Sequence, residues 1–336
     1  MTGAATATLR EYLATQGLTG GEATTLTPLS GGQSNPTFVV DTAGKRMVLR
    51  KKPTGLLLAS AHAIDREYRV MGALQGTGVP VPRMLAYCED ANIVGTPFYV
   101  MEFIEGRVLL DQSLPGMEPG ERLQTYREMC RVLAALHQVD FSSVGLQNFG
   151  RAGNYFQRQI TRWTRQCEGA TLPLPRALQQ LMKWLPDHIP QRDETTLLHG
   201  DYRLDNLVFH PNEPRVIAVL DWELSTLGDP LADLSYQCMA WHIPATLWRG
   251  VAGLDLGALG IPSEADYLRL YSEATGQEIP ENWNFYLAFN LFRMAAILHG
   301  IGERAAAGNA TAADAVETGR KAGLIADIGW DCASRL

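Results

Sequence analysis

Residues 197–209 read LLHGDYRLDNLVF, and residues 216–223 read VIAVLDWE after a turn through PNEP. The first stretch predicts a short apolar strand, a polar loop and a second strand, and the other predicts a third strand that ends at Asp221. Asp201 and Asn206 lie at the two ends of the polar loop, five residues apart. Hairpin pairing of the second and third strands would bring Asn206 close to Asp221. These strand ends therefore carry the candidate chemical groups.

Two carboxylates and an amide in this order suit phosphoryl transfer from ATP. Mg²⁺ takes hard oxygen ligands and keeps several waters, so Asn206, Asp221 and the substrate phosphates would be suitable partners. A separate carboxylate, Asp201, would orient the attacking hydroxyl and accept its proton. Because the transition state is loose, positioning and charge neutralisation matter more than strong basicity. The spacing therefore predicts a kinase-type catalytic loop beside a metal site.

Length and composition restrict the remaining choices. The chain has 336 residues, is 46% hydrophobic and 19% charged, and has a formal net charge of −7. This length predicts about two domains or one two-lobed unit, and the hydrophobicity excludes a disordered chain. An acidic balance argues against nucleic acid as a partner. The five cysteines are scattered without a CxxC pair, which indicates neither a disulfide framework nor a zinc site.

The sequence also bears on the cellular compartment. No run of about 18 consecutive apolar residues indicates a membrane span. No basic segment followed by an apolar one marks a secretory signal at the start of the sequence. We therefore expect a cytoplasmic protein without a membrane partner, and the sequence carries no signal for its oligomeric state.

The predicted secondary structure changes in type near residue 105. Short β-type runs with one helical pattern among them dominate before it, and long helical patterns dominate after it. We predict an α+β, two-lobed fold with a small mixed β lobe over residues 1–104. A larger helical lobe would follow over residues 105–336 and would contain the catalytic loop, the metal site and the acceptor pocket.

The helical pattern of the first lobe contains a carboxylate within its apolar stripe. Glu67 follows Ile64 by three residues and projects with it. A carboxylate that faces a core needs a cation nearby. Strand alternation puts Arg50 and Lys51 on opposite faces of the preceding strand, and either could pair with Glu67. The alternative is that Glu67 lies at the edge of the stripe and reaches water.

At these residues the sequence resembles the aminoglycoside/choline phosphotransferase family, which has a protein-kinase-like fold. The matching motifs are HGD at 199–201, DN at 205–206 and DWE at 221–223. The resemblance implies ATP and Mg²⁺ as cofactors, Asp201 as the catalytic residue, and Asn206 and Asp221 as metal ligands. It also implies that Asp233 braces the catalytic loop rather than reacting.

The resemblance further implies a nucleotide site in the first lobe. Residues 29–35 resemble the family's nucleotide-covering loop, although a Ser-Gly-Gly turn alone is more often a simple hairpin. Arg50 stands where a basic residue meets the ATP phosphates, with Lys51 as the alternative, and residues 99–106 resemble the adenine-binding hinge. The implied nucleotide-binding residues are Ser30, Gly31, Gly32, Gln33, Ser34, Asn35, Arg50, Glu67, Glu102 and Ile104.

One branch of the family is especially similar. Residues 49–53, 65–70, 95–102, 221–230 and 292–297 look like the phosphotransferase domain that some proteins carry fused to an acyl-CoA dehydrogenase. No extension of dehydrogenase length follows here, so we expect the stand-alone form. In that branch the resemblance implies phosphorylation of a hydroxylated acyl-CoA, such as a 4-hydroxyacyl thioester.

Two departures from protein kinases favour a small-molecule acceptor. Gly200 replaces the arginine that protein kinases carry in this motif, and only seven residues separate Asp221 from Asp229, too few for a peptide-docking segment. We therefore predict a small-molecule kinase that phosphorylates a hydroxyl group, with a hydroxyacyl-CoA as the favoured acceptor. The alternatives are an aminoglycoside or other small-alcohol kinase and, from another class, a catalytically silent nucleotide-binding scaffold.

Overall fold

The structure, a computed structural model, describes residues 3–29, 35–54, 63–192, 194–308 and 314–335. The predicted nucleotide-loop residues 30–34 lie outside this part. Contacts divide the chain into two compact units. The first consists of Met1–Val108, Ser142–Gln147 and Asn206–Ser225, and the second of Leu109–Phe141, Asn148–Asp205 and Thr226–Leu336. The first unit thus includes two later segments that the predicted lobes assign to the second, and the lobe boundary itself stays a prediction.

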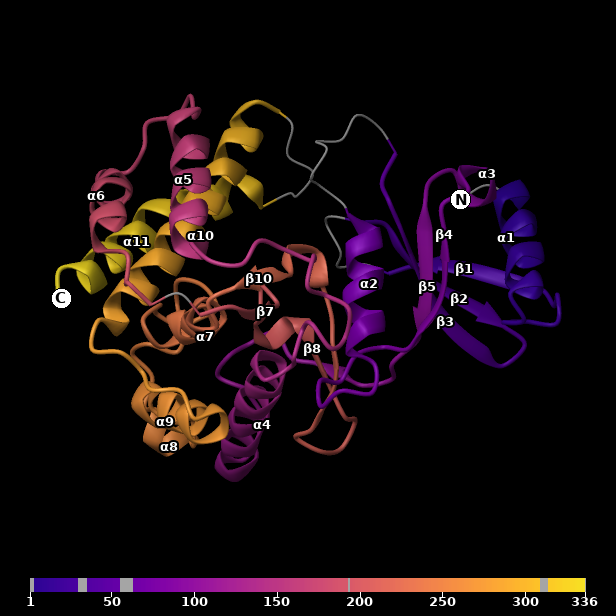
Figure 1. Cartoon of the computed structure of the whole chain (residues 1–336), viewed down its shortest axis with the longest axis horizontal. Helices are drawn as coiled ribbons and strands as arrows, with labels where there is room; N and C mark the ends of the chain where they lie inside the picture. The colour runs from indigo at the N-terminus through magenta and orange to yellow at the C-terminus, as the bar shows by residue number, and fades with distance from the viewer. Residues whose placement is uncertain (1–2, 30–34, 55–62, 193, 309–313, 336) are drawn as a thin grey trace. The chain divides into compact units, whose positions relative to one another are not determined.

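The first unit is built on a five-stranded antiparallel sheet in the order β1-β2-β3-β5-β4 (Figure 1). Its strands are β1 (Thr24–Pro28), β2 (Thr37–Thr42), β3 (Lys45–Lys51), β4 (Met84–Cys88) and β5 (Phe98–Glu102). β1, β2 and β5 consist largely of β-branched or aromatic residues, which favour strands. The mixed β character predicted for this part of the chain is therefore confirmed.

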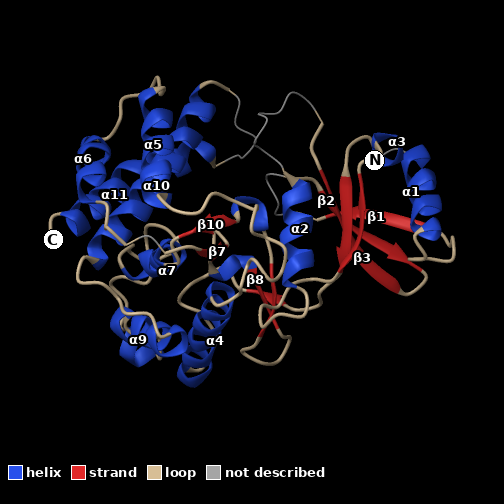
Figure 2. Cartoon of the chain, viewed as in Figure 1, coloured by secondary structure: helices blue, strands red, loops and turns tan. Residues whose placement is uncertain are grey.

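Helices cover both faces of this sheet (Figure 2). They are α1 (Gly3–Thr15), α2 (Ile64–Leu74) and α3 (Ala91–Val94). On the face of α1 and α3, buried apolar side chains of both helices pack against alternate residues of the strands, among them Leu9, Val40, Met47, Leu49 and Val94. The opposite face meets α2 and carries the polar contacts described below. Strand alternation therefore separates an apolar face of the sheet from a face that carries polar and charged side chains.

A second, three-stranded sheet completes the first unit. Its order is β6 (Arg107–Val108), β8 (Leu207–Phe209) and β9 (Val216–Val219), all antiparallel. Gly106 lies directly before β6, where a Cβ atom would come 2.4 Å from the carbonyl oxygen of Phe209. Only glycine therefore allows the chain to pass this close to β8.

The second unit is mainly helical, as predicted (Figure 2). Its helices of eight or more residues are α4 (Pro119–His137), α5 (Tyr155–Glu168), α6 (Arg176–Trp184), α7 (Leu231–Cys238), α9 (Glu264–Thr275), α10 (Trp283–Ala306) and α11 (Ala315–Ala333). The shorter elements are η1 (Leu185–His188), η4 (Met239–Trp241) and α8 (Leu256–Leu259), with a ribbon of β7 (Thr196–Leu198) and β10 (Thr226–Gly228). Helices α10 and α11 approach closely where Gly302 meets Gly319.

Helix α10 supplies much of the core of the second unit. Within the described part of the chain it is the one helix long and apolar enough, by length and composition, to cross a membrane. However, 78% of that apolar segment is buried inside the protein. A mostly buried helix of this kind is also what the core of a globular protein contains. Polar residues such as Asn290 and Arg293 interrupt it, which is why the sequence shows no continuous apolar run.

An ion pair ties the segment after η4 to α9 and α10. His242 Nε2 lies 2.9 Å from Glu264 Oε2, and Trp283 Nε1 donates to Glu264 Oε1 at 3.0 Å. Burial lowers the pKa of His242, but hydrogen bonds and charge interactions with Cys332 and Glu264 outweigh this effect and raise the pKa to about 9. Because the folded-state pKa exceeds the ordinary histidine value, protonated His242 stabilises the fold at low pH. This stabilisation is fully present below about pH 6.5, the pKa of histidine in the unfolded chain, and it is lost as the pH rises through the folded-state pKa of about 9.

We therefore expect His242→Gln to lower the free energy of unfolding more at pH 6 than at pH 10. The difference between the two losses should be on the order of 3 kcal/mol, which is the linkage value of the raised pKa. Urea unfolding of the wild type and the variant at both pH values measures it. Glu264→Gln should show a pH dependence of the same sign but smaller, because Cys332 also raises the pKa of His242. Equal losses of the His242→Gln variant at both pH values would contradict the assigned ion pair.

Candidate active site

Arg50 on β3 joins two of the predicted site residues within the first unit. Its Nε lies 2.9 Å from Glu67 Oε2 on α2, and its Nη2 lies 2.9 Å from Asp221 Oδ1 at the end of β9. The Nε–H is not directed at the Glu67 oxygen, so that contact is ionic rather than a directed hydrogen bond. A third carboxylate, Glu223, lies 3.8 Å from Nη2. One guanidinium group thus gathers three acidic side chains.

Glu67 is buried, with 1% of its surface exposed, so the alternative that it reaches water is wrong. Its carboxylate accepts hydrogen bonds from the Tyr99 hydroxyl at 2.9 Å and from Asn35 Nδ2 at 2.8 Å. Tyr99 is the direct cross-strand partner of Arg50, which puts both side chains on the face that meets α2. Burial raises the pKa of Glu67, while Arg50 and the two hydrogen bonds oppose that rise.

The acidic partners of Arg50 keep its guanidinium group protonated. Burial alone would lower the pKa of Arg50, but Glu67, Tyr99, Asp221 and Glu223 raise it above its usual value. Arg50 is thus a fixed, permanently charged group at the end of β3. A lysine in the same place would offer a point charge without this planar arrangement of donors.

The side chain of Lys51 lies on the opposite face of the sheet from that of Arg50. Its Nζ donates a hydrogen bond to the carbonyl oxygen of Val94 on α3, across the opposite face of the sheet. Of the two basic residues left open by the sequence, Arg50 is therefore the partner of Glu67, as strand alternation requires. Whether Arg50 contacts phosphates stays a prediction.

We expect Glu67→Gln to lower the free energy of unfolding by about 3 kcal/mol, because it leaves a buried guanidinium without its buried partner. Urea unfolding at neutral pH measures this loss. The matched control lies at the other end of the same strand, where Arg46 pairs with Asp41 at 3.5 Å and both side chains are about half exposed. Asp41→Asn should cost less than about 1 kcal/mol. Similar costs for the two variants would contradict the importance of the buried pair.

The other predicted nucleotide-binding residues that the structure describes are Asn35, Glu102 and Ile104. Asn35 directs its amide nitrogen to Glu67 and is itself buried. Glu102 ends β5, where its backbone N–H donates to the carbonyl oxygen of Arg83 at 2.9 Å. Ile104 lies half-buried in the segment between β5 and β6. The adenine contacts assigned to Glu102 and Ile104, and the nucleotide contacts of residues 30–35, stay predictions.

The β8–β9 hairpin sets the spacing of the two predicted metal ligands. The backbone N–H of Leu220 donates to the carbonyl oxygen of Asn206 at 2.8 Å, so the hairpin pairing is confirmed. Asp221 follows directly and adopts a left-handed backbone with φ of +65°. This conformation is costly for most side chains, although aspartate tolerates it better than most, and such strain concentrates at functional sites. The roles of Asn206 and Asp221 as metal ligands stay predictions.

Asp201, the predicted catalytic residue, belongs to the second unit. Its Oδ1 accepts a hydrogen bond from the hydroxyl of Tyr236 on α7, and its Oδ2 accepts one from Arg203 Nε at 3.0 Å. Its backbone N–H donates to the ring of His199 at 3.2 Å, which gives that histidine a structural contact in the loop. Because Asn206 and Asp221 belong to the first unit, the convergence of all three groups stays a prediction.

Asp233 braces the loop around Asp201. Its carboxylate accepts hydrogen bonds from the backbone N–H groups of His199, at 2.6 Å, and Gly200, at 2.9 Å. Burial raises the pKa of Asp233, but His137, the charge interaction with His199 and the backbone N–H of Gly200 outweigh it and hold the pKa below its usual value. Arg293 on α10 donates to the carbonyl oxygen of Gly200 at 2.6 Å from the other side. The predicted bracing contact of Asp233 is confirmed.

Several side chains near Asp201 were missed from the sequence. Tyr236 lies three residues after Asp233, which the sequence did identify, so both project from one face of α7 toward the loop of Asp201, and this spacing was the available signal. Arg203 follows Asp201 by two residues in the same loop. Arg293 comes from α10, and nothing local in the sequence connects it to the loop.

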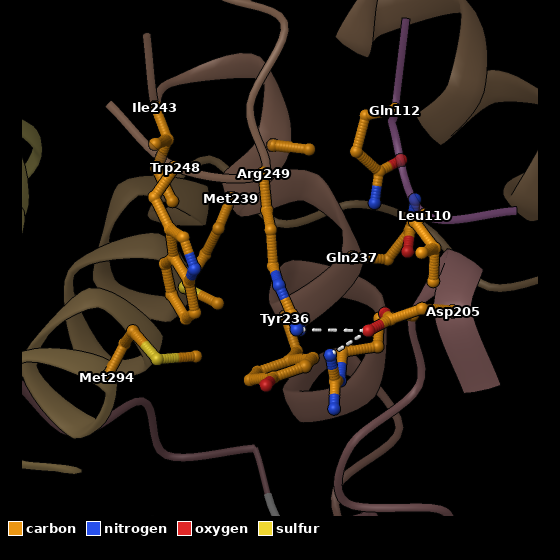
Figure 3. A pocket seen from close by; sticks show the side chains of 12 residues that line it. Leu110, Gln112, Asp205, Tyr236, Gln237, Met239, Ile243, Trp248, Arg249 and Met294 are labelled. Atoms are coloured by element: carbon orange, nitrogen blue, oxygen red, sulfur yellow. Dashed lines mark hydrogen bonds and ion pairs between the residues drawn. The ribbon is translucent and has the colours of Figure 1, made fainter. Parts of the chain in front are cut away.

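A pocket lies beside this loop within the second unit (Figure 3). Its apolar wall is made by Met239, Ile243, Trp248 and Met294. The polar part of its lining is supplied by Arg203, Asp205, Tyr236, Arg249 and two glutamines. It therefore combines an apolar surface with a small cluster of charges.

The charged cluster contains two cations on one carboxylate. Asp205 contacts both Arg203 Nη1 and Arg249 Nη2, the latter at 3.1 Å (Figure 3). Arg249 has a left-handed backbone with φ of +49°, and a Cβ atom on the following Gly250 would come 1.7 Å from the carbonyl oxygen of Ile243. The loop conformation that brings Arg249 to the pocket is thus tightly specified. Because Arg203 also pairs with Asp201, the two guanidinium groups meet two carboxylates.

Comparisons with known proteins agree on one family. A sequence profile described as the phosphotransferase enzyme family matches residues 25–272. The mouse protein acyl-CoA dehydrogenase family member 10 is 47% identical over 332 residues, which are 97% of this chain and 31% of that protein. The chain thus spans about a third of the length of that curated relative.

Solved structures show the same relationship. A Ralstonia eutropha protein, provisionally named an aminoglycoside phosphotransferase, is 52% identical with a TM-score of 0.90, and the match covers 98% of each chain. A thermostable mutant of aminoglycoside phosphotransferase APH(4)-Ia, in complex with ADP and hygromycin B, has a TM-score of 0.61 at 16% identity and covers 95% of this chain and 98% of that one. The latter similarity concerns the fold alone, and it agrees with the predicted kinase-like α+β architecture.

Proposed function

Because this chain belongs to the phosphotransferase enzyme family, we propose that it transfers the γ-phosphoryl group of ATP to a hydroxyl group of a small molecule. The acceptor that we favour is a hydroxyacyl-CoA. The single observation that carries the proposal is the Arg50 cluster, in which one buried guanidinium joins Glu67 and the strand-end Asp221. Phosphoryl transfer depends on such preorganised charge more than on covalent chemistry.

The donor groups fit Mg²⁺. Asn206 offers an amide oxygen and Asp221 a carboxylate, both hard ligands, from neighbouring strand ends of one hairpin. Asn206 and Asp221 would hold the ion, with phosphate oxygens and waters as the other ligands. When bound, Mg²⁺ would neutralise charge on the phosphates. Arg50, already beside Asp221, would supply a second positive charge toward them.

Asp201 would act on the acceptor. With Oδ2 held by Arg203, the carboxylate is fixed in orientation, and Oδ1 is the atom that would accept the hydroxyl proton. The acceptor oxygen would form its bond to phosphorus as ADP leaves. A loose transition state needs only weak basicity from this group, so an ordinary aspartate suffices.

The pocket beside the loop favours an amphipathic acceptor over a polycationic one. Arg203 and Arg249 both contact Asp205, and Arg203 also pairs with Asp201. A polycationic aminoglycoside would therefore find both carboxylates already paired with guanidinium groups. An acyl chain would find the apolar wall around Met239 and Trp248. The names of the acyl-CoA dehydrogenase relatives agree with a thioester acceptor.

An acceptor panel tests the proposal. Release of ADP from MgATP would be measured with 4-hydroxyacyl-CoAs, aminoglycosides, choline and hexoses, and phosphorus NMR would identify each product. We expect rapid turnover with 4-hydroxyacyl-CoAs and none with the matched acyl-CoA that lacks the hydroxyl. Preference for an aminoglycoside would overturn the acceptor class. ATP binding without turnover on any acceptor would favour a silent scaffold.

A further inference from the structure

One contact of Asp201 is not required by the proposed reaction. The hydroxyl of Tyr236 donates a hydrogen bond to Oδ1, the oxygen that would accept the proton of the acceptor. Tyr236 also lines the pocket described above, and Asp201 itself does not (Figure 3). The phenol therefore connects the pocket to the catalytic carboxylate and occupies the position that an acceptor hydroxyl needs.

The phenol is held in this position from several sides. Tyr236 is 7% exposed, and the Arg293 guanidinium carbon lies 5.3 Å from the centre of its ring. Arg293 is in turn fixed by its hydrogen bond to the carbonyl oxygen of Gly200. Burial and the charge of Asp201 both raise the pKa of Tyr236, so its O–H stays protonated and donates at neutral pH. With Arg203 on Oδ2, both oxygens of Asp201 have a donor.

We propose that Tyr236 is a surrogate for the acceptor: its hydroxyl holds Asp201 Oδ1 while the acceptor is absent and yields it to the hydroxyl of a bound acceptor. This inference rests on the proposed function, in which Asp201 is the proton acceptor. In productive transfer, the acceptor oxygen bonds to phosphorus, its proton moves to Oδ1, and the bond from phosphorus to ADP breaks. If water takes the acceptor's place, the same steps give ADP and inorganic phosphate. The surrogate suppresses this wasteful hydrolysis by denying Oδ1 to water.

Tyr236→Phe tests the surrogate, because it removes one hydroxyl and keeps the ring. We expect ADP release from MgATP without any acceptor to rise about tenfold, the size of effect that one hydrogen bond to a charged group has. With a 4-hydroxyacyl-CoA as probe, KM for the acceptor should fall, since its hydroxyl no longer competes with the phenol, while kcat changes by less than about threefold. A residue that merely orients Asp201 would move both activities downward instead.

Two controls accompany this variant. Tyr267 is fully buried in the same unit, and its hydroxyl has no hydrogen-bond partner within the described residues, so Tyr267→Phe should leave both activities unchanged. Combining Tyr236→Phe with Asp201→Asn should abolish the gain in hydrolysis, because the gain depends on the freed carboxylate. Thermal unfolding of each variant identifies any loss of fold.

The outcomes separate this inference from the proposed function. The surrogate role would be overturned if Tyr236→Phe left acceptor-independent ADP release unchanged, or lowered it in parallel with transfer. Transfer by the wild type would in that case still support the proposed kinase activity. A wild type that phosphorylates no acceptor in the panel would instead overturn the proposed function. A selective rise in hydrolysis with a lower acceptor KM supports the surrogate.

Discussion

Replacing Asp201 with asparagine should lower the rate of phosphoryl transfer by about a thousandfold and leave ATP binding nearly unchanged. The substitution keeps the size of the side chain but removes the carboxylate that would accept the hydroxyl proton in the proposed reaction, and a positioned base is worth about 10²–10⁴-fold in rate. ATP binding should persist because the Arg50 cluster belongs to the other compact unit. Single-turnover kinetics and nucleotide titration of the same preparation measure the two effects separately.

A neighbouring carboxylate provides the control for this prediction. Asp205 lies four residues after Asp201 and also contacts Arg203, but it faces Arg249 and the pocket. Asp205→Asn should therefore act mainly on the acceptor KM rather than on kcat. A rate in Asp201→Asn close to that of the wild type, or an equal loss of kcat in both variants, would refute the role of Asp201.

Local periodicity was sufficient to predict much of the first unit. Alternation along β3 separates Arg50 from Lys51, and the i, i+3 relation of Ile64 and Glu67 places the carboxylate on the buried face of α2. The ion pair between β3 and α2 follows from these two patterns and the cost of an unpaired buried charge. Such contacts are predictable because each partner's direction is set by its own element.

The surroundings of Asp201 could not be predicted in the same way. Tyr236 and Arg293 reach the loop from α7 and α10, 35 and 93 residues away from their partners in sequence. Their contacts depend on how helices pack, which periodicity does not specify. The same limit applies to the compact units, since the β8–β9 hairpin joins a sheet strand, β6, from about 100 residues earlier in the chain.

Replacing Asp221 with asparagine should abolish most of the Mg²⁺ dependence of ATP binding and lower turnover by about a thousandfold. Asparagine tolerates the left-handed backbone found at this position, so the hairpin should keep its shape. It removes one negative charge from the hard-ligand pair and so weakens the hold on the ion, whose neutralising effect is worth several kcal/mol in such reactions. Nucleotide titration with and without Mg²⁺ gives a readout that does not depend on turnover.

Glu223 is the matched control for this last variant, because its carboxylate also approaches Arg50, at 3.8 Å, yet it is not a proposed metal ligand. If charge near Arg50 were all that mattered, Glu223→Gln and Asp221→Asn would change ATP binding in the same direction, with or without Mg²⁺. If Asp221 holds the ion, Asp221→Asn alone removes the Mg²⁺ dependence, and Arg50, which keeps Glu67, preserves the residual affinity for the phosphates. A Mg²⁺ dependence that survives in Asp221→Asn would therefore refute the metal site and, with it, the reason for placing a strained aspartate at the end of β9.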